Sequence, residues 1–214
     1  MTLTLYVGSK RYSSWSLRPY LALAHSGVSF ETRTILLDQP ETKDQIAAVA
    51  PAGRVPVLHH DGLVIWDSLA ICEYVNELSL SSPGGASLWP TDRARRATAR
   101  AVAAEMHAGF VALRTNMPMD LIATKPGEGH TPEALADARR VMTIWREQLA
   151  ISKGPFLFGA FSIADAMFAP VTARFTTYRV DLDATCRMYV EAVQSLPSFV
   201  AWKQDAATEP ATRA

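Results

Sequence analysis

The sequence has few cysteines, no excess of charge of either sign and no long apolar run. Its 214 residues include two cysteines, and 21 basic residues balance 21 acidic ones. Cys72 and Cys186 lie far apart without metal-ligand spacing, which argues against a disulfide framework and favours a reducing cytoplasm. A neutral chain also lacks the basic footprint of a protein that binds nucleic acid non-specifically. We therefore expect neither disulfide cross-links nor nucleic-acid binding.

Membrane spans and metal sites are not expected either. The longest apolar candidate, 156–171, falls short of the roughly eighteen apolar residues of a membrane span. It is interrupted by Ser162 and Asp165, which form an S-x-x-D variant of the helix capping box. The N-terminus is typical of a short strand rather than of a signal peptide. The five histidines show no H-x-x-x-H pattern and no carboxylate cluster. With 49% apolar residues, the chain predicts a soluble, packed, cytoplasmic protein.

The first part of the chain alternates between strand and helix patterns. The predicted strands cover 3–7, 30–36, 55–59 and 63–66, and the predicted helices cover 14–25, 43–49 and 69–78. Asp61-Gly62 between the last two strands is a hairpin signal. The resulting order β-α-β-α-β-β-α, with one parallel crossover, predicts a mixed sheet covered by helices.

The composition changes after the third predicted helix. Residues 80–90 are rich in Ser, Pro and Gly and predict a linker, and the remaining chain follows helical patterns. We expect one long arginine-rich helix over 91–121, kinked near Pro118. His107 and Arg114 would share one face of this helix, two turns apart, turned to solvent or to an interface. Further helices are expected over 132–150, 163–178, 183–196 and 198–207.

Three hydroxyls stand where the first strand meets the first helix. Residues 12–18 read Tyr-Ser-Ser-Trp-Ser-Leu-Arg, with the hydroxyls on Ser13, Ser14 and Ser16. Hydroxyl donors beside helix N–H groups suit an anion, including a thiolate, because the dipole and the donors favour negative charge there. A cysteine thiol has an ordinary pKa of about 8.5, and each unit of depression is worth about 1.4 kcal/mol. The alternative is plain helix capping by Ser13 or Ser14.

Two further motifs each allow a functional and a structural interpretation. Val55-Pro56 enters a strand and can hold a cis peptide bond, which leaves the neighbouring N–H and C=O free to pair with a short peptide. The alternative is an ordinary trans proline on an edge strand. Asp67 and Ser68 open a helix, where Ser68 can bind a ligand carboxylate and Asp67 a ligand ammonium. The alternative is again a helix cap.

Taken together and in this order, these motifs resemble the glutathione S-transferase superfamily, and the resemblance spans nearly the whole chain. It implies an α/β thioredoxin-like domain (βαβαββα) over 1–79, a linker over 80–90 and an all-helical domain over 91–214. The first motif is most similar to the serine-type zeta class, whose signature reads Ser-Ser-Cys-Ser-Trp-Arg. Trp15 stands in the place of that cysteine and Leu17 in the place of that tryptophan.

By position, the resemblance implies that glutathione binds in the first domain. The hydroxyl that stabilises its thiolate would be that of Ser13, with Ser14 and Ser16 as alternative donors. The residues implied to bind glutathione are Arg18, Arg54, Val55, Pro56, Asp67, Ser68 and His107. The backbone of Val55, before a cis proline, would pair with the cysteinyl part, and the Asp-Ser pair would hold the γ-glutamyl end.

The activity implied by the resemblance is that of a glutathione transferase, in which the thiolate attacks a hydrophobic electrophilic small molecule. The expected walls of the electrophile cavity are Tyr12, Trp15, Met106, Phe110 and Met117. One alternative is a glutathione-dependent cis–trans isomerase of the maleylacetoacetate isomerase type, which Trp15 disfavours because it is not a thiol. Another is a non-catalytic glutathione-binding scaffold. The resemblance also implies a homodimer with an interface near 93–100, whereas the electrophile cannot be read from the sequence.

Overall fold

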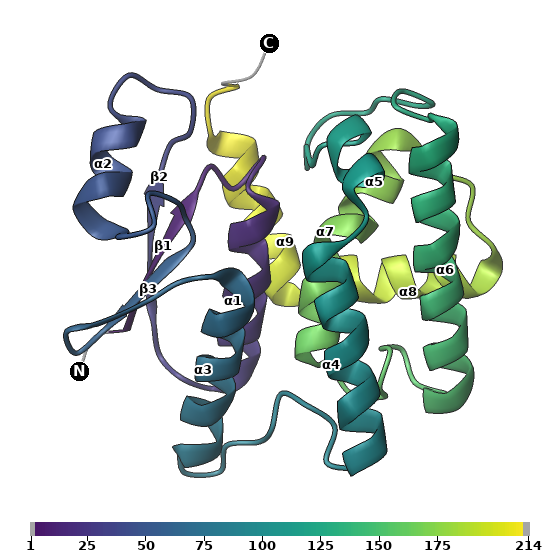
Figure 1. The fold of residues 1–214 in the computed structure, drawn as a ribbon, viewed down its shortest axis with the longest axis horizontal. Helices are drawn as coiled ribbons and strands as arrows, with labels where there is room; N and C mark the ends of the chain where they lie inside the picture. Colours follow the sequence, from purple (N-terminus) through teal and green to yellow (C-terminus); the bar gives the residue numbers. More distant parts are fainter. Residues whose placement is uncertain (1–2, 212–214) are drawn as a thin grey trace.

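The computed structural model describes residues 3–211 and places a sheet with its flanking helices beside a group of further helices (Figure 1). The elements of the first domain are β1 (Leu3–Gly8), α1 (Ser14–Ser26), β2 (Glu31–Ile35), α2 (Thr42–Val49), β3 (Val57–His60), β4 (Leu63–Ile65) and α3 (Ser68–Ser81). The predicted order of strands and helices is confirmed. The mixed sheet has the strand order β2-β1-β3-β4, with β1 parallel to β2 and antiparallel to β3.

Strand β1 lies inside the sheet and is buried on both of its faces. The paired residues of β1 and β2 run from Thr4–Glu31 to Gly8–Ile35. Leu3, Leu5 and Val7 belong to the main core, together with residues of α1 and α3. Tyr6 instead packs against a smaller cluster that contains Ile46 of α2. Alternate residues of β1 therefore point to helices on opposite faces of the sheet, as the period of a strand requires.

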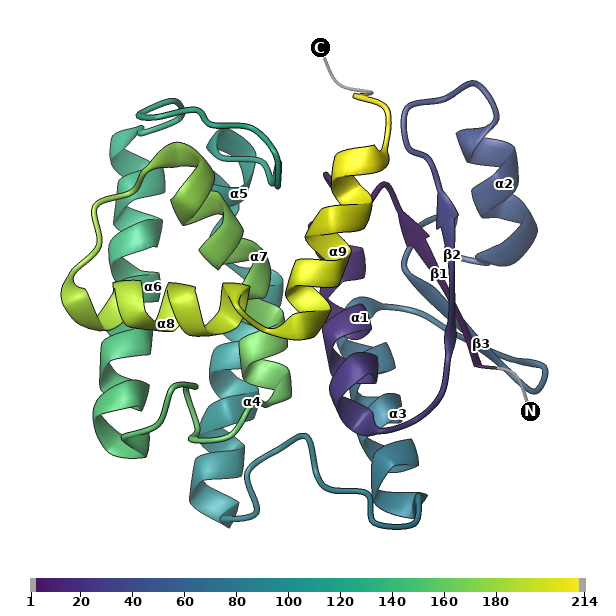
Figure 2. The ribbon, with the colours of Figure 1, turned by 180° about the vertical axis from the view of Figure 1, so that it is seen from behind.

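The second part of the described chain is helical. Its elements are α4 (Arg93–Ala108), α5 (Val111–Asn116), α6 (Pro132–Ser152), α7 (Ile163–Tyr178), α8 (Ala184–Gln194) and α9 (Pro197–Thr208). Helix α7 is buried almost along its whole length and packs against α1 of the first domain. Helix α9 also returns to the first domain and runs beside α1 (Figure 2). No helix within residues 3–211 has the length and apolar character needed to cross a membrane.

The expected single helix over 91–121 is wrong. Helix α4 ends at Ala108, and Phe110 adopts a left-handed backbone conformation with φ 57° before α5 begins. A Cβ at Gly109 would lie 2.7 Å from a carbonyl oxygen of the last turn of α4, so this tight approach requires glycine. The break places His107 and Arg114 on different helices, where the Arg114 guanidinium donates to the His107 carbonyl oxygen at 3.0 Å.

Candidate functional site

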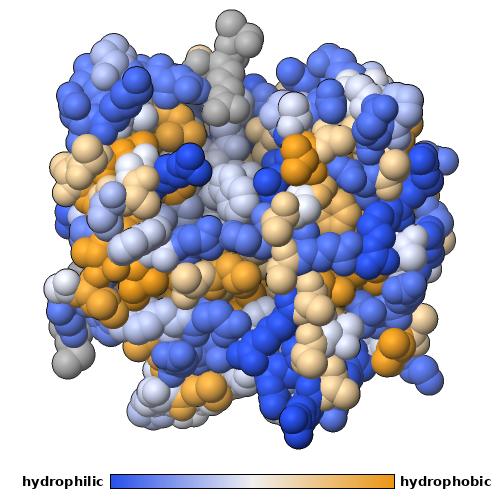
Figure 3. Space-filling model, in the orientation of Figure 1, coloured by the Kyte–Doolittle hydropathy of each residue, from blue (hydrophilic) through white to orange (hydrophobic). Residues whose placement is uncertain are grey.

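Two adjoining cavities open near the start of α1. The first has a volume of about 410 Å³ and is lined by Trp15, Ala52, Arg54, Val55, Pro56, Trp66, Asp67 and Ser68. The second has a volume of about 380 Å³, and the residues lining it include Tyr12, Ser13, Ser14, Trp15, Arg54, Val55, Arg114, Pro118, Met119 and Arg174. Apolar side chains gather where the two domains meet, with hydrophilic ones around them (Figure 3). Trp15, Arg54 and Val55 line both cavities, so a single ligand can reach from one into the other.

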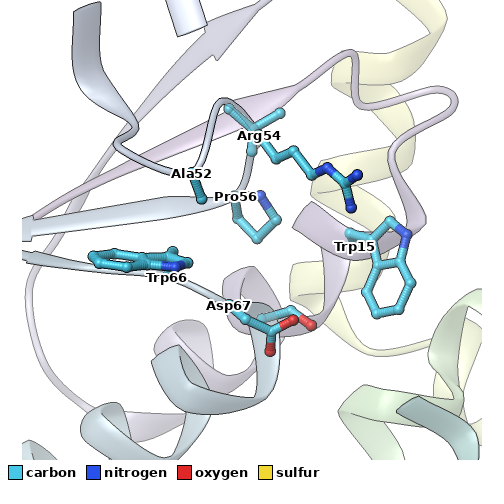
Figure 4. A pocket seen from close by; sticks show the side chains of 8 residues that line it. Trp15, Ala52, Arg54, Pro56, Trp66 and Asp67 are labelled. Carbon is cyan, nitrogen blue, oxygen red and sulfur yellow. The ribbon is translucent and has the colours of Figure 1, made fainter. Parts of the chain in front are cut away.

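The first cavity lies between the start of β3 and the start of α3. The Val55–Pro56 peptide bond is cis, as the resemblance implies. Asp67 caps α3 by accepting a hydrogen bond from the Leu69 amide at 2.8 Å. In Figure 4, the Arg54 side chain extends toward Trp15, and Asp67 lies across the cavity from Arg54. The second oxygen of the Asp67 carboxylate, Oδ2, lies 3.4 Å from Nε2 of His107 and forms no ion pair with a lysine or arginine among the described residues.

Ser68 places a buried, unpaired hydroxyl beside the first cavity. Its side chain is 1% exposed, and its hydroxyl has no hydrogen-bond partner within residues 3–211. A buried hydroxyl without a partner costs free energy, and this one stands at the N-terminus of a helix, where the helix dipole favours an anion. A ligand carboxylate in the first cavity would satisfy both the hydroxyl and the dipole.

The three serines of the first motif have different environments. Ser13 is the N-cap of α1, because its hydroxyl oxygen accepts from the Ser16 amide at 3.3 Å. The Ser13 hydroxyl in turn donates to the Ser16 hydroxyl at 2.7 Å, and Ser16 also accepts from the Gly8 amide. Ser16 is fully buried and lines neither cavity. Ser13 therefore has the predicted capping role and also lines the second cavity. The buried Ser16 contacts the Ser13 hydroxyl by a hydrogen bond but does not line either cavity.

Ser14 lies at the second cavity beside an arginine from the helical domain. Its hydroxyl accepts a hydrogen bond from the Arg174 guanidinium at 3.2 Å, and the same guanidinium donates to the Met117 carbonyl oxygen at 2.9 Å. Another nitrogen of Arg174, Nη1, has no partner within residues 3–211. Burial, followed by the charge of Arg114, lowers the pKa of Arg174 to about 10. The side chain is therefore cationic at neutral pH.

Besides the exposed Arg54, three arginines concentrate positive charge around the second cavity: Arg114 and Arg174 line it, and Arg18 lies behind it under Trp15. Burial, followed by repulsion from Arg174 and Arg114, lowers the pKa of Arg18 to about 9, and burial also lowers that of Arg114. None of the three forms an ion pair with a carboxylate among the described residues. Buried charges are normally paired. This unbalanced charge makes the second cavity a suitable place for an anion.

Two of the predicted glutathione contacts lie behind the cavities. His107 does not line either of them, but its Nε2 is 3.4 Å from Oδ2 of Asp67. Arg18 is 1% exposed and packs under Trp15, with its guanidinium carbon 4.3 Å from the ring centroid. Both residues can orient side chains that line the cavities. The structure places Arg54, Val55, Pro56, Asp67 and Ser68 together at the first cavity, as the resemblance implies.

The predicted walls of the electrophile cavity are partly wrong. Tyr12 and Trp15 line the second cavity, but Met106, Phe110 and Met117 are buried in the core. Pro118 and Met119, which follow α5, line the second cavity instead.

The most informative residue that the sequence analysis missed is Arg174. A sequence signal existed, because Arg174 is the only basic residue of the mostly apolar α7, and a charge in such a helix is normally satisfied by a specific partner. The described residues contain no group of three His, Cys, Asp or Glu side chains able to hold a metal ion.

Comparisons with known proteins agree on one family. A model of the glutathione S-transferase N-terminal domain matches residues 12–78, and a model of the C-terminal domain matches residues 128–202. The chain is 29% identical over 199 residues to a probable maleylacetoacetate isomerase of Caenorhabditis elegans, covering 90% of each chain. It is 30% identical over 178 residues to glutathione S-transferase F10 of Arabidopsis thaliana, covering 80% of each. A solved glutathione transferase homolog from Burkholderia, with bound glutathione, superposes with a TM-score of 0.74 at 26% identity, covering 98% of this chain and all of that one.

Proposed function

Because the chain belongs to the glutathione S-transferase family, we propose that its first cavity binds reduced glutathione and its second cavity holds the electrophile. The protein is an enzyme, a glutathione transferase. The observation that best supports the placement of glutathione is the buried hydroxyl of Ser68, which has no partner and stands at the N-terminus of α3. The γ-glutamyl carboxylate accepts from this hydroxyl and from the helix amides, while its ammonium pairs with Asp67.

In the proposed mechanism, the glutathione sulfur lies at the junction of the two cavities, next to the start of α1. The Ser13 hydroxyl turns from Ser16 toward the sulfur and donates a hydrogen bond that favours the thiolate, and the N-terminus of α1 favours it further. The thiol proton passes to solvent. The thiolate then forms a carbon–sulfur bond with the electrophile, and the leaving group departs with the electron pair of the bond that breaks. Serine forms no covalent intermediate.

Binding of glutathione should depend on Ser68. We expect Ser68→Ala to weaken the affinity about 10-fold, because a hydrogen bond to a charged carboxylate contributes about 1.5 kcal/mol. Calorimetric titration with reduced glutathione measures this loss. Ser81→Ala is the matched control, since Ser81 lies on the same helix but is exposed at its other end. Equal affinities for Ser68→Ala and the wild type would remove Ser68 from the binding site.

The positive charge of the second cavity favours an electrophile that carries a carboxylate. Arg174 and Arg114 both line this cavity, and the Nη1 group of Arg174 has no partner among the described residues. Relatives of this chain are named maleylacetoacetate isomerase. A second candidate function is therefore the glutathione-dependent cis–trans isomerisation of a maleyl acid. In that reaction glutathione adds to the double bond, a single bond rotates, and glutathione leaves unchanged.

The isomerase can be distinguished from the transferase by the fate of glutathione. Incubation with maleylacetone should give the trans isomer without net loss of glutathione if the chain is an isomerase. We expect Arg174→Met to lower kcat/KM for this substrate at least 10-fold, because the guanidinium no longer pairs with its carboxylate. An Arg174→Lys variant keeps the charge and should retain part of the activity. No turnover of maleylacetone by the wild type would leave conjugation as the proposed function.

We also propose that the chain forms a homodimer in the cytoplasm, with the first domain of one copy against residues 93–100 of the other. The two cysteines are buried and unpaired, which fits a reducing compartment. Light scattering during size-exclusion chromatography tests the dimer, and a monomer at micromolar concentration would rule it out. Fractionation of the source cells tests the location.

A further inference from the structure

Trp15 occupies the position where the zeta-class signature has cysteine. No step of the proposed mechanism uses the Trp15 side chain. Its side chain is partly buried and lines both cavities. Three groups surround its ring. The guanidinium carbon of Arg18 lies 4.3 Å from the ring centroid, that of Arg114 lies 4.9 Å away, and the His107 ring packs edge-on at 5.3 Å. Trp15 is thus the common neighbour of Arg18 and Arg114.

The indole ring compensates for partners that Arg18 lacks. Two guanidinium nitrogens of Arg18, Nε and Nη1, have no hydrogen-bond partner within residues 3–211, although the side chain is buried. The face of an indole ring carries negative charge density and attracts a guanidinium more strongly than the ring of tyrosine or phenylalanine does. Trp15 therefore stabilises the positive charge of Arg18, which forms no ion pair with a carboxylate among the described residues.

Arg114 reaches the second cavity from the helical domain. Its Nη1 donates to the carbonyl oxygens of His107 and Met106, at 3.0 and 3.5 Å, which holds one side of the guanidinium at the end of α4. The Trp15 ring, from the first domain, holds the guanidinium from the other side of the domain boundary. The position of this charge is therefore set jointly by both domains.

We propose that Trp15 is a specificity-determining residue, which holds the Arg114 guanidinium at the second cavity and thereby favours electrophiles that carry a carboxylate. The proposal rests on the transferase function proposed above and concerns the choice of electrophile. With a smaller side chain at position 15, Arg114 keeps only its hydrogen bonds to the carbonyl oxygens of Met106 and His107. Its guanidinium then populates several rotamers. A mobile guanidinium binds a carboxylate less well, because its ordering must then be achieved on binding.

A matched pair of electrophiles tests the proposal. The substrates 4-chloro-3,5-dinitrobenzoate and 2-chloro-1,3-dinitrobenzene differ only in the carboxylate, and with either one the thiolate displaces chloride and a carbon–sulfur bond forms. Each kcat/KM is divided by the uncatalysed rate constant with free glutathione. We expect Trp15→Leu to lower the ratio of carboxylate to neutral substrate about 10-fold relative to the wild type. Any loss common to both substrates cancels in this ratio.

Two further variants make the test specific. Trp15→Phe keeps an aromatic ring of weaker attraction and should give an intermediate ratio, also if Trp15→Leu fails to fold. Arg114→Leu should lower the ratio at least as much, and adding Trp15→Leu to it should lower it no further, because both changes remove the same interaction. A wild-type ratio in the Trp15 variants would overturn the proposal. Absence of conjugation with either substrate in the wild type would instead overturn the transferase function itself.

Discussion

Replacing Ser13 with alanine is expected to lower kcat/KM for glutathione conjugation about 100-fold, the usual effect of losing one hydrogen bond to a developing or stabilised anion. The cause is an increase in the pKa of the bound thiol, because its thiolate loses the hydroxyl donor at the start of α1. The helix also loses its N-cap, at a cost of about 1 kcal/mol of stability. Conjugation assays over a range of pH measure the change in the thiol pKa. Thermal unfolding measures the loss of stability.

Matched serine variants decide which hydroxyl carries the effect. Ser13→Thr keeps the hydroxyl and the cap and should restore most of the activity. Ser14→Ala removes a hydroxyl that already accepts from Arg174, and we expect a smaller loss. Ser16→Ala should act through Ser13, because Ser16 is buried and lines neither cavity. Full activity in Ser13→Ala would exclude Ser13 as the thiolate donor and leave Ser14 as the remaining serine hydroxyl that lines the second cavity.

Replacing Asp165 with alanine is expected to destabilise the protein by about 4 kcal/mol, because four donors then lose one buried acceptor. These donors are the Leu157 amide, the Ser162 amide, the Ser162 hydroxyl and the Tyr189 hydroxyl. The confirmed capping box thus ties the start of α7 to the preceding loop and to α8. Urea unfolding measures the loss. Asp183→Ala is the matched control, since it removes an exposed N-cap and should cost about 1 kcal/mol.

The pH dependence of stability gives a second test of Asp165. Burial raises its pKa from 3.8 to about 6, although hydrogen bonds from Leu157 and Ser162 act to lower it. Between these two values the folded chain keeps a proton that the unfolded chain has released. The contribution of Asp165 to stability is therefore largest at low pH and falls as the pH rises toward about 6. Asp165→Asn should remove this part of the pH dependence, and an unchanged profile would show that Asp165 is not its source.

The fold was largely predictable because its local signals agree with one another. A short run of strand-forming residues marked β1, the Asp-Gly turn marked the hairpin of β3 and β4, and Ser162 with Asp165 marked the start of α7. The break after α4 was not predicted, since the helical pattern continues through Gly109 and Phe110. Its cause is a close backbone approach that glycine permits, and the packing of distant helices decides whether such a break forms.

The candidate site was predictable in the first domain and less so in the second. The glutathione-binding residues of the first domain stand in short motifs whose order is informative, and the structure brings most of them to one cavity. The identity of the side chains that line the electrophile cavity depends on which face of each helix points inward. Met106 and Met117 therefore could not be distinguished from Met119, and Arg174, 160 residues from its partner Ser14, was missed.

We propose above all that the first domain binds reduced glutathione and stabilises its thiolate. Titration of the wild-type protein with reduced glutathione at neutral pH, followed by the ultraviolet absorbance of the thiolate, tests it most directly. We predict saturable growth of this absorbance at a pH where free glutathione is mainly protonated, and its loss in Ser13→Ala while calorimetry still detects binding. Saturable binding without thiolate absorbance in the wild type, or no binding at all, would contradict the account.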